Sequence, residues 1–441
     1  LRLRKKILNK FKKFKFISLI DKNSLLFDNC DVGNGSIVFP NASIGPNVSI
    51  GKFCVIHNSV VIEHDVNIGD NSYIGPGSVV CGNSRIENNV LLGANSTMIQ
   101  DTFIKNNCRL GAGSVLIKSF KIQNQTLIGS PAKIKKKNMN NLFVSTACLK
   151  GEKSYDRVIN EFLNNDIKNI ELTGVHPYLE SNKLEKLIND YKNKGANFTF
   201  HNYFPPPKEP IVLNYLTENY ELKKKCQNII TKAVSLAKKT DVKVYAFHPG
   251  YYREATINQK GYFNFFGSKR KNFEYGFNVF KNDFINFYKS LKIDSENKEF
   301  HLGFENLFPN PDGSNDSFMC DYEEISKIFN LAKTENINLK LLIDLGHLTI
   351  SSNFLKFDKD EFLKKIIDKY GDRIFEIHIS ENDGVRDLHN RIDKDSWQLK
   401  ALRYFKKLPH FEKIIFTYES RGMTITEIKN DLQLIKQNLI Y

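Results

Sequence analysis

The 441 residues are too many for one ordinary globular core, and a hydrophobic fraction of 41% excludes a disordered chain, so two packed domains are expected. No apolar run approaches the roughly 18 residues of a membrane-spanning helix, so no such span is predicted. The net charge of +15 is concentrated, because twelve Lys and Arg residues lie in segments 1–16 and 133–137, and removing them leaves +3. We therefore expect no nucleic-acid partner, which would require dense neutralisation of phosphates.

The N-terminal segment 1–27 begins LRLRKKILNKFKKFKF, with eight Lys and Arg residues and no acid. Leu3, Ile7, Phe11 and Phe14 recur there at helical spacing, which predicts a basic amphipathic helix. Two interpretations remain open: the helix makes peripheral contact with an anionic membrane surface, or it packs against the following domain, which we favour. The seven cysteines are scattered without a CxxC pair and no signal peptide is found, so we expect a cytoplasmic protein.

A six-residue period follows, in which seventeen successive positions are aliphatic or Met. These positions are Val32, Val38, Ile44, Ile50, Ile56, Ile62, Ile68, Ile74, Val80, Ile86, Leu92, Met98, Ile104, Leu110, Leu116, Ile122 and Ile128. Such a period is typical of the left-handed parallel β-helix, in which three hexapeptides form one triangular coil around an aliphatic core. We assign it residues 28–137. Glycine often follows the aliphatic residue, as at Gly45, Gly51 and Gly75, where we expect corners with positive φ.

A filled prism has no interior cleft, so its chemistry must lie on the outer surface. The segment VVIEHDVNIGD places His64 two residues after the inward Ile62, where its side chain points outward, and Asp65 follows it. Together with LLGANSTMI, LGAGSVLIK and the closing IGSPAK, this segment resembles the bacterial acyltransferases that acetylate amino-sugar nucleotides and sialic-acid-like sugars.

That resemblance implies a homotrimer that binds acetyl-CoA between neighbouring prisms and takes a sugar or nucleotide-sugar acceptor. It implies that His64 is the general base and that Asp65 orients its ring. The positions that match the CoA site are Tyr73, Ala94 and Ala112, whereas His57 is expected to be structural.

The sequence departs from this family at its N-terminus. Several relatives carry a nucleotide-sugar-binding domain before the prism, and here only about 27 residues precede it. Acceptor recognition is then rebuilt, supplied by the other domain, or lost. If it is lost, the β-helix serves only as a trimerisation scaffold.

Residues 140–441 alternate short β-rich runs with helical stretches, and eight β/α units in this length predict a TIM barrel. The runs are 141–147, 169–174, 197–203, 242–250, 300–306, 339–347, 373–380 and 413–420. Seven of them end in a metal-capable side chain: Glu171, His201, His248, Glu305, Asp344, His378 and Glu419. Buried ionisable groups are costly unless paired or metal-bound, so this pattern predicts a divalent metal site for Zn, Mn, Mg or Co.

The second half resembles the xylose-isomerase-like superfamily, which includes ketose epimerases and endonuclease IV. The resemblance to the epimerases implies four ligands to one metal, Glu305, Asp344, His378 and Glu419, with the two glutamates also acting as catalytic acid and base. The segment HISENDGVRDLHNRI adds Asp387 and His389. With His201, His248 and His347, these residues complete the set that endonuclease IV uses for three zinc ions.

The leading hypothesis is a bifunctional carbohydrate-biosynthesis enzyme that joins acetyl transfer to metal-dependent isomerisation or epimerisation of a sugar or sugar phosphate. The alternative is a zinc phosphodiesterase barrel. The long loop 250–276 is expected to cover the substrate with Arg253, Lys269, Arg270 and Lys271. His176, His301 and His410 are expected to be structural.

Overall fold

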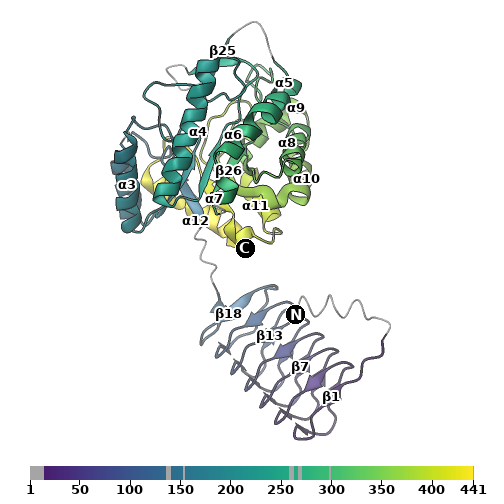
Figure 1. Cartoon of the computed structure of the whole chain (residues 1–441). Helices are drawn as coiled ribbons and strands as arrows, with labels where there is room; N and C mark the ends of the chain where they lie inside the picture. The colour runs from purple at the N-terminus through teal and green to yellow at the C-terminus, as the bar shows by residue number, and fades with distance from the viewer. Residues whose placement is uncertain are drawn as a thin grey trace. The chain divides into compact units, whose positions relative to one another are not determined.

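The computed structural model describes residues 14–135, 141–151, 154–257, 263–266, 271–296 and 299–440 (Figure 1). The chain divides into two compact units, Leu1–Lys137 and Asn138–Tyr441. Most of the predicted amphipathic helix lies outside the described residues, so that prediction stays open. Among the described residues, no helix combines the length and the apolar character needed to cross a bilayer.

Three parallel sheets form the sides of the first unit, and successive strands visit them in turn. The first sheet holds β1 (Leu19–Ile20), β4 (Ile37–Val38), β7 (Val55–Ile56), β10 (Tyr73–Ile74), β13 (Leu91–Leu92), β16 (Arg109–Leu110), β18 (Thr126–Ile128) and, antiparallel at its end, β19 (Lys133–Ile134). The second holds β2 (Leu25–Leu26), β5 (Ser43–Ile44), β8 (Val61–Ile62), β11 (Val79–Val80), β14 (Thr97–Met98) and β17 (Val115–Leu116). The third holds β3 (Asp31–Val32), β6 (Ser49–Ile50), β9 (Asn67–Ile68), β12 (Arg85–Ile86) and β15 (Phe103–Ile104).

This architecture confirms the predicted left-handed β-helix. The second residue of most strands points inward, and the series from Val38 to Leu116 is buried throughout. The period slips once at the end, because Leu110 pairs with Leu127 and not with Ile128. The last coil is therefore one residue short of three hexapeptides, and Ile122 and Ile128 are exposed. The β-helix begins at β1, earlier than the predicted residue 28. Ile20 and Leu26 continue the six-residue series toward the N-terminus.

The predicted role of the glycines in the β-helix is wrong. The residues with positive φ at the corners are mainly Asn and Asp, such as Asn47 and Asn71, whose side chains tolerate the left-handed region. Gly75 has no positive φ but lies against the next coil, because a Cβ there would come within 2.7 Å of the Ala94 nitrogen. Close approach of neighbouring coils explains these glycines.

The second unit is a closed barrel of eight parallel strands, which confirms the predicted TIM barrel. The strands are β20 (Leu142–Ser145), β21 (Asn169–Leu172), β22 (Asn197–His201), β23 (Val244–Phe247), β26 (His301–Glu305), β27 (Lys340–Asp344), β28 (Ile374–Ile379) and β29 (Ile415–Tyr418). The helical segments are α2 (Tyr155–Asn164), α3 (Ser181–Asn193), α4 (Tyr220–Thr240), α5 (Phe273–Val279), η1 (Phe280–Phe284), α6 (Ile285–Ser290), α7 (Ile293–Glu296), α8 (Tyr322–Thr334), α9 (Leu345–Leu355), α10 (Lys359–Tyr370), η2 (Gly371–Arg373), α11 (Trp397–Phe405), η3 (Phe411–Lys413) and α12 (Ile425–Ile440).

Strand register brings the ends of the barrel strands to one height. Asp344 pairs with His378 across β27 and β28, and His378 pairs with Thr417 of β29. The carboxyl ends of parallel strands meet on one face of a barrel, so side chains at these ends converge.

The loop after β23 folds into a hairpin of β24 (Glu254–Ile257) and β25 (Phe263–Phe266). Arg253 and Lys271, which were predicted to contact the substrate, instead bind other groups of this chain. Arg253 lies 3.4 Å from Asp316, and Lys271 donates to the Leu216 carbonyl at 3.1 Å. Lys269 and Arg270 lie outside the described residues.

Candidate functional site

The first candidate site is a hydrogen-bonded pair on the outside of the β-helix, directly after β8. Nδ1 of His64 lies 2.8 Å from Oδ2 of Asp65, and the two side chains are 56% and 50% exposed. Asn47, one coil earlier, donates to Oδ1 of Asp65 at 3.1 Å. Hydrogen bonds from His64 and then Asn47 lower the pKa of Asp65, so its carboxylate stays ionised beside the ring. A carboxylate on Nδ1 fixes the tautomer in which Nε2 can accept a proton.

Gly82 supports the imidazole from the next coil, and sequence reasoning missed it. A Cβ at this position would lie 2.6 Å from Nε2 of His64, so any larger residue would meet the ring. The Gly82 nitrogen also donates to Oε2 of Glu63 at 2.8 Å. The signal was present in the repeat, because Gly82 occupies the corner position equivalent to His64 one coil later.

The predicted CoA-binding residues lie elsewhere on the β-helix. Tyr73 is in β10, and Ala94 and Ala112 follow β13 and β16 at the corner after the first sheet, whereas His64 follows a strand of the second sheet. A single chain does not bring these groups together. His57 stacks on Phe39, with ring centroids 4.7 Å apart.

The second candidate site is a buried cluster at the carboxyl ends of the barrel strands. It gathers all nine predicted metal ligands together with Glu171. Six of the ligands come from strand ends or the residues just beyond them, whereas His347 lies in the first turn of α9 and Asp387 and His389 lie in the loop after β28. Any two ligand atoms within one group of three lie less than 4.8 Å apart.

The nine ligands divide into three groups of three. They are His201 with His248 and Glu305, Asp344 with His378 and Glu419, and His347 with Asp387 and His389. The group of Glu305, Asp344 and His347 links all three, so they form one continuous cluster.

Glu305 is the centre of this cluster. Its Oε2 lies 3.3 Å from Nε2 of His201 and 3.2 Å from Nε2 of His248, and its Oε1 lies 3.2 Å from Nδ1 of His347. Burial raises the pKa of Glu305, but the rings of His248, His201 and His347 outweigh burial and bring the pKa to about 2. The carboxylate is therefore ionised, as a metal ligand must be.

Outer hydrogen bonds orient three of the imidazoles. Nδ1 of His347 lies 2.9 Å from the carbonyl oxygen of Asn306, and Nδ1 of His389 lies 2.9 Å from that of Glu419. Nδ1 of His248 lies 2.9 Å from the Tyr251 hydroxyl. Each contact directs Nε2 toward the cluster, which is the usual arrangement around metal-binding histidines.

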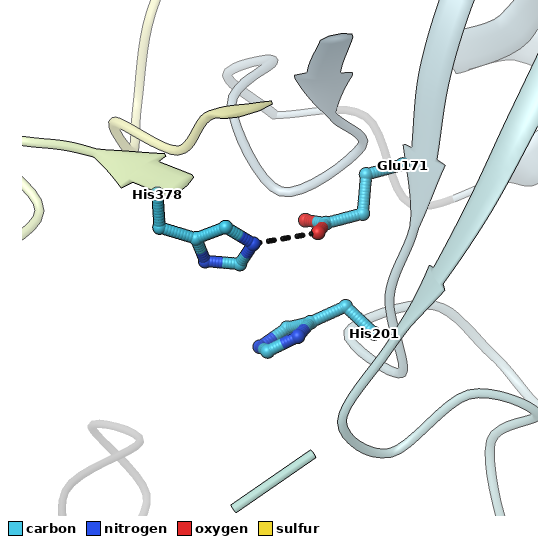
Figure 2. A group of neighbouring side chains, drawn as sticks. All are labelled: Glu171, His201 and His378. Carbon is cyan, nitrogen blue, oxygen red and sulfur yellow. Dashed lines mark hydrogen bonds and ion pairs between the residues drawn. The ribbon is translucent and has the colours of Figure 1, made fainter. Parts of the chain in front are cut away.

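His378 is held on both sides. Its Nδ1 lies 2.8 Å from Oε2 of Glu419. Its Nε2 lies 2.9 Å from Oε2 of Glu171, and Figure 2 shows this second contact. Burial raises the pKa of Glu171 to about 8 despite the opposing effect of His378. Sequence reasoning noted Glu171 but left it out of the ligand set. It missed Glu376, which lies inside β28 with its Oε1 3.7 Å from Nε2 of His378.

The donor set fits divalent cations. Carboxylate and imidazole atoms of the cluster are buried and have no hydrogen-bond partner among the described residues, including Asp344 Oδ2, His347 Nε2 and Asp387 Oδ1. Buried polar atoms without partners are costly unless a ligand satisfies them. Borderline nitrogen and oxygen donors of this kind suit Zn²⁺ and Mn²⁺.

A cavity of about 910 Å³ opens above the cluster. His201, His248, Glu305, His347 and Glu419 lie at its base, and Arg421 is also part of its lining. His176 lines the cavity too and packs on Tyr155, with ring centroids 4.3 Å apart. His410 lies away from it and its Nε2 is 3.0 Å from the Ile374 carbonyl.

Comparison with known proteins supports the repeat in the first unit. Residues 65–100 match the family model of the bacterial transferase hexapeptide, and residues 83–118 match that of the hexapeptide repeat of succinyl-transferase. The sequence has no significant match among curated proteins.

Solved structures similar to the first unit include a GDP-perosamine N-acetyltransferase from Caulobacter crescentus in complex with CoA and GDP-perosamine, with 26% identity over 31% of this chain and a TM-score of 0.30. The acetyltransferase domain of PglB from Neisseria gonorrhoeae in complex with acetyl coenzyme A has 25% identity over 30% of this chain and a TM-score of 0.29. This chain spans 65% of the length of each. A D-tagatose 3-epimerase-like protein has 19% identity, with 68% of this chain and 97% of that protein covered and a TM-score of 0.49.

Proposed function

We propose that the β-helix transfers an acetyl group from acetyl-CoA to an amino sugar or a sialic-acid-like sugar, free or nucleotide-linked. The observation that carries this proposal is the His64–Asp65 pair on a bacterial-transferase hexapeptide repeat. Nε2 of His64 takes the proton of the acceptor amine or hydroxyl as that group attacks the thioester carbonyl. The carbon–sulfur bond then breaks, and the CoA thiolate leaves with the proton that the imidazolium returns.

The complete acetyltransferase site requires a second copy of the chain in this proposal. Tyr73, Ala94 and Ala112 would hold CoA, and they lie in or after strands of the first sheet, whereas His64 follows a strand of the second. A homotrimer, in which the corners of neighbouring prisms face each other, would bring the two parts together. The seven free cysteines suit a reducing cytoplasm.

Release of free CoA tests this function. The full chain is supplied with acetyl-CoA and 4-amino sugar nucleotides, and His64→Ala is compared with the parent chain. We expect release to fall about 10²-fold or more in the variant, the usual contribution of a positioned base. Equal release from both chains would support a silent scaffold.

For the barrel, we propose divalent-metal-dependent chemistry on a carbohydrate substrate. The observation that carries this proposal is the gathering of nine ligand side chains into three linked groups. When bound, divalent cations polarise substrate oxygens and lower the pKa of a bound water. The chain itself supplies ionised carboxylates at Glu305 and Asp387, fixed imidazoles, and a cavity lined by the ligands at the strand ends.

Two reactions remain, and they need different numbers of cations. Isomerisation or epimerisation would use one cation on Glu305, Asp344, His378 and Glu419, with the two glutamates moving a proton. Phosphoester hydrolysis would use all three groups. The geometry supports hydrolysis better, because His347, Asp387 and His389 form a buried group that a single-cation reaction leaves without a role. A sugar phosphoester suits the low charge of the folded body better than DNA does.

Metal analysis of the purified chain separates the two reactions. About three zinc ions per chain, with release of phosphate from sugar phosphoesters, would support hydrolysis. One exchangeable Mn²⁺ or Co²⁺, with interconversion of sugar phosphates, would support isomerisation. Cleavage of abasic-site DNA by less enzyme than substrate would overturn the choice of a carbohydrate substrate.

A further inference from the structure

We propose that Arg421 is the phosphate-binding residue of the barrel. Its guanidinium would hold the phosphate of a sugar phosphate or sugar phosphoester at the edge of the ligand cluster. Arg421 would thereby select an anionic substrate over a neutral sugar of similar shape. This inference rests on the proposed function of the barrel and names the residue of that site that recognises the phosphate.

Arg421 lies next to the ligand cluster in the sequence and in the cavity. It follows the ligand Glu419 by two residues, just beyond the carboxyl end of β29. It is exposed and lines the main cavity together with seven of the nine ligands. A substrate in this cavity therefore has access to the cluster and to the guanidinium.

The backbone of Arg421 is held against the loop that carries two of the ligands. Its nitrogen donates to the His389 carbonyl at 2.8 Å. Two residues later, the Met423 nitrogen donates to the Cys148 carbonyl, also at 2.8 Å. Because the chain is fixed on both sides of this residue, binding a substrate needs to order only the side chain, which keeps the entropic cost low.

The charge of Arg421 acts on the ligand group that contains His389. Burial lowers the pKa of His389 and Asp387 raises it, and the next largest effect is that of Arg421, which lowers it, although the net shift is upward. Charges interact this strongly only at short range. The guanidinium therefore lies close to the edge of the cluster formed by His347, Asp387 and His389.

Arg421 is the cavity cation that is left for a substrate. Of the three Lys and Arg side chains among the described lining residues, two already have partners within the chain. Arg386 donates from Nε at 3.0 Å and from a terminal nitrogen at 2.8 Å to Oδ2 of Asp383. Nζ of Lys208 lies 5.3 Å from the centre of the Tyr178 ring. The guanidinium of Arg421 makes no ion pair and no side-chain hydrogen bond with any residue that the structure describes.

The chemistry of a guanidinium favours a phosphate. It stays charged, and its N–H donors lie in one plane, so that two of them can bind two oxygens of one phosphate. A neutral sugar offers only hydroxyl groups, which form weaker hydrogen bonds with a charged donor than an anion does. A sugar carboxylate presents a similar pair of oxygens, so the experiment must compare the two anions.

Calorimetric titration of the full chain tests the inference, with zinc-loaded and chelator-treated protein measured in parallel. The probes are glucose 6-phosphate, glucuronate and glucose, which differ at C6. We expect Arg421→Gln to bind glucose 6-phosphate about tenfold or more weakly than the parent chain, since charge-assisted hydrogen bonds contribute this much, and to bind glucose unchanged. Arg421→Lys keeps the charge without the planar donors, so it should recover only part of the loss.

Lys208→Gln is the matched control, because Lys208 is exposed, lines the same cavity and loses the same charge. We expect it to bind glucose 6-phosphate like the parent chain. The thermal unfolding midpoint of each variant checks that the barrel is folded. Unchanged affinity in Arg421→Gln, an equal loss in Lys208→Gln, or a larger loss for glucuronate than for glucose 6-phosphate would overturn the inference.

The zinc content of the same samples reports separately on the proposed metal function. Selection of the phosphate by Arg421 in a chain that retains no cation would reject the metal function and leave this inference standing. Retention of zinc without that selection would do the reverse.

Discussion

Nε2 of His378 lies 2.9 Å from Oε2 of Glu171, and both side chains are fully buried. This contact leaves Nδ1 as the ring nitrogen that faces Glu419 and the cluster. Glu171 therefore positions His378 from behind, as outer hydrogen-bond partners do for many metal-binding histidines.

Glu171→Gln is expected to weaken retention of the cation at His378 by about 10–100-fold, because the amide changes the hydrogen bond that holds Nε2 of the ring in place. Metal content after dialysis against graded chelator measures the change. Glu376→Gln is the matched comparison, since its carboxylate lies further from Nε2, at 3.7 Å. A larger loss in Glu376→Gln than in Glu171→Gln would contradict the positioning role.

Gly82→Ala is expected to displace the His64 imidazole, because the new Cβ would lie 2.6 Å from Nε2. The ring is exposed and can rotate away, so the fold should survive while acetyl transfer falls about tenfold or more. CoA release and the thermal unfolding midpoint are measured on the same sample. Unchanged CoA release would show that the ring position seen here is not the catalytic one.

Asp65→Asn removes the charge beside His64 and keeps the shape of the site. Asn is tolerated at the φ of 60° found here and can still accept the hydrogen bond from Asn47. We expect a loss of about tenfold or more in kcat with a stable β-helix, because the ring loses both its fixed tautomer and the stabilisation of its charged form. Parental kcat in this variant would leave Asp65 with only a corner-forming role.

The fold could be predicted from the sequence because both domains are periodic. The six-residue series fixes which side chains point inward, and the eight β-rich runs fix the strand ends that carry Glu305 and Asp344. The shortened last coil could not be predicted, because Ile128 satisfies the pattern as well as Leu127 does. Register decides between them.

The ligand cluster could also be predicted, because parallel strands bring their carboxyl ends together. Its outer contacts could not. The Asn306 carbonyl that orients His347 depends on a distance between segments that no local pattern encodes. Glu376 was missed because it lies inside a strand, away from the strand end at which ligands were sought.

Removal of metal is expected to affect the two units differently. Dialysis against a chelator should abolish the barrel reaction and lower the unfolding temperature of the barrel, because cations that bind only the folded state stabilise it. CoA release should not change, since the His64 site contains no group of metal ligands among the described residues. The two activities are measured before and after chelation. Parallel loss of both would show that they depend on one another.

The pH dependence of barrel stability is expected to reflect Glu324, which anchors the segment that follows β23. Its Oε1 accepts from the Tyr252 hydroxyl at 2.9 Å, and its Oε2 accepts from the nitrogens of Met319 and Cys320. Burial and then Asp321 raise its pKa from 4.5 to about 7. Since the folded state holds this proton more tightly than the unfolded chain, its stabilising effect is complete below pH 4.5 and is lost as the pH rises to about 7.

Glu324→Gln should remove this dependence, because the amide keeps an oxygen for the two backbone N–H groups and an NH₂ for Tyr252. The shift corresponds to at most about 3 kcal/mol. The unfolding temperature of the variant, relative to the parent chain, should therefore rise between about pH 4.5 and 7 and stay level above pH 7. Thermal unfolding of both chains in matched buffers measures it. A difference that falls across this range would mean that the glutamate is more easily ionised in the folded protein than in the unfolded chain.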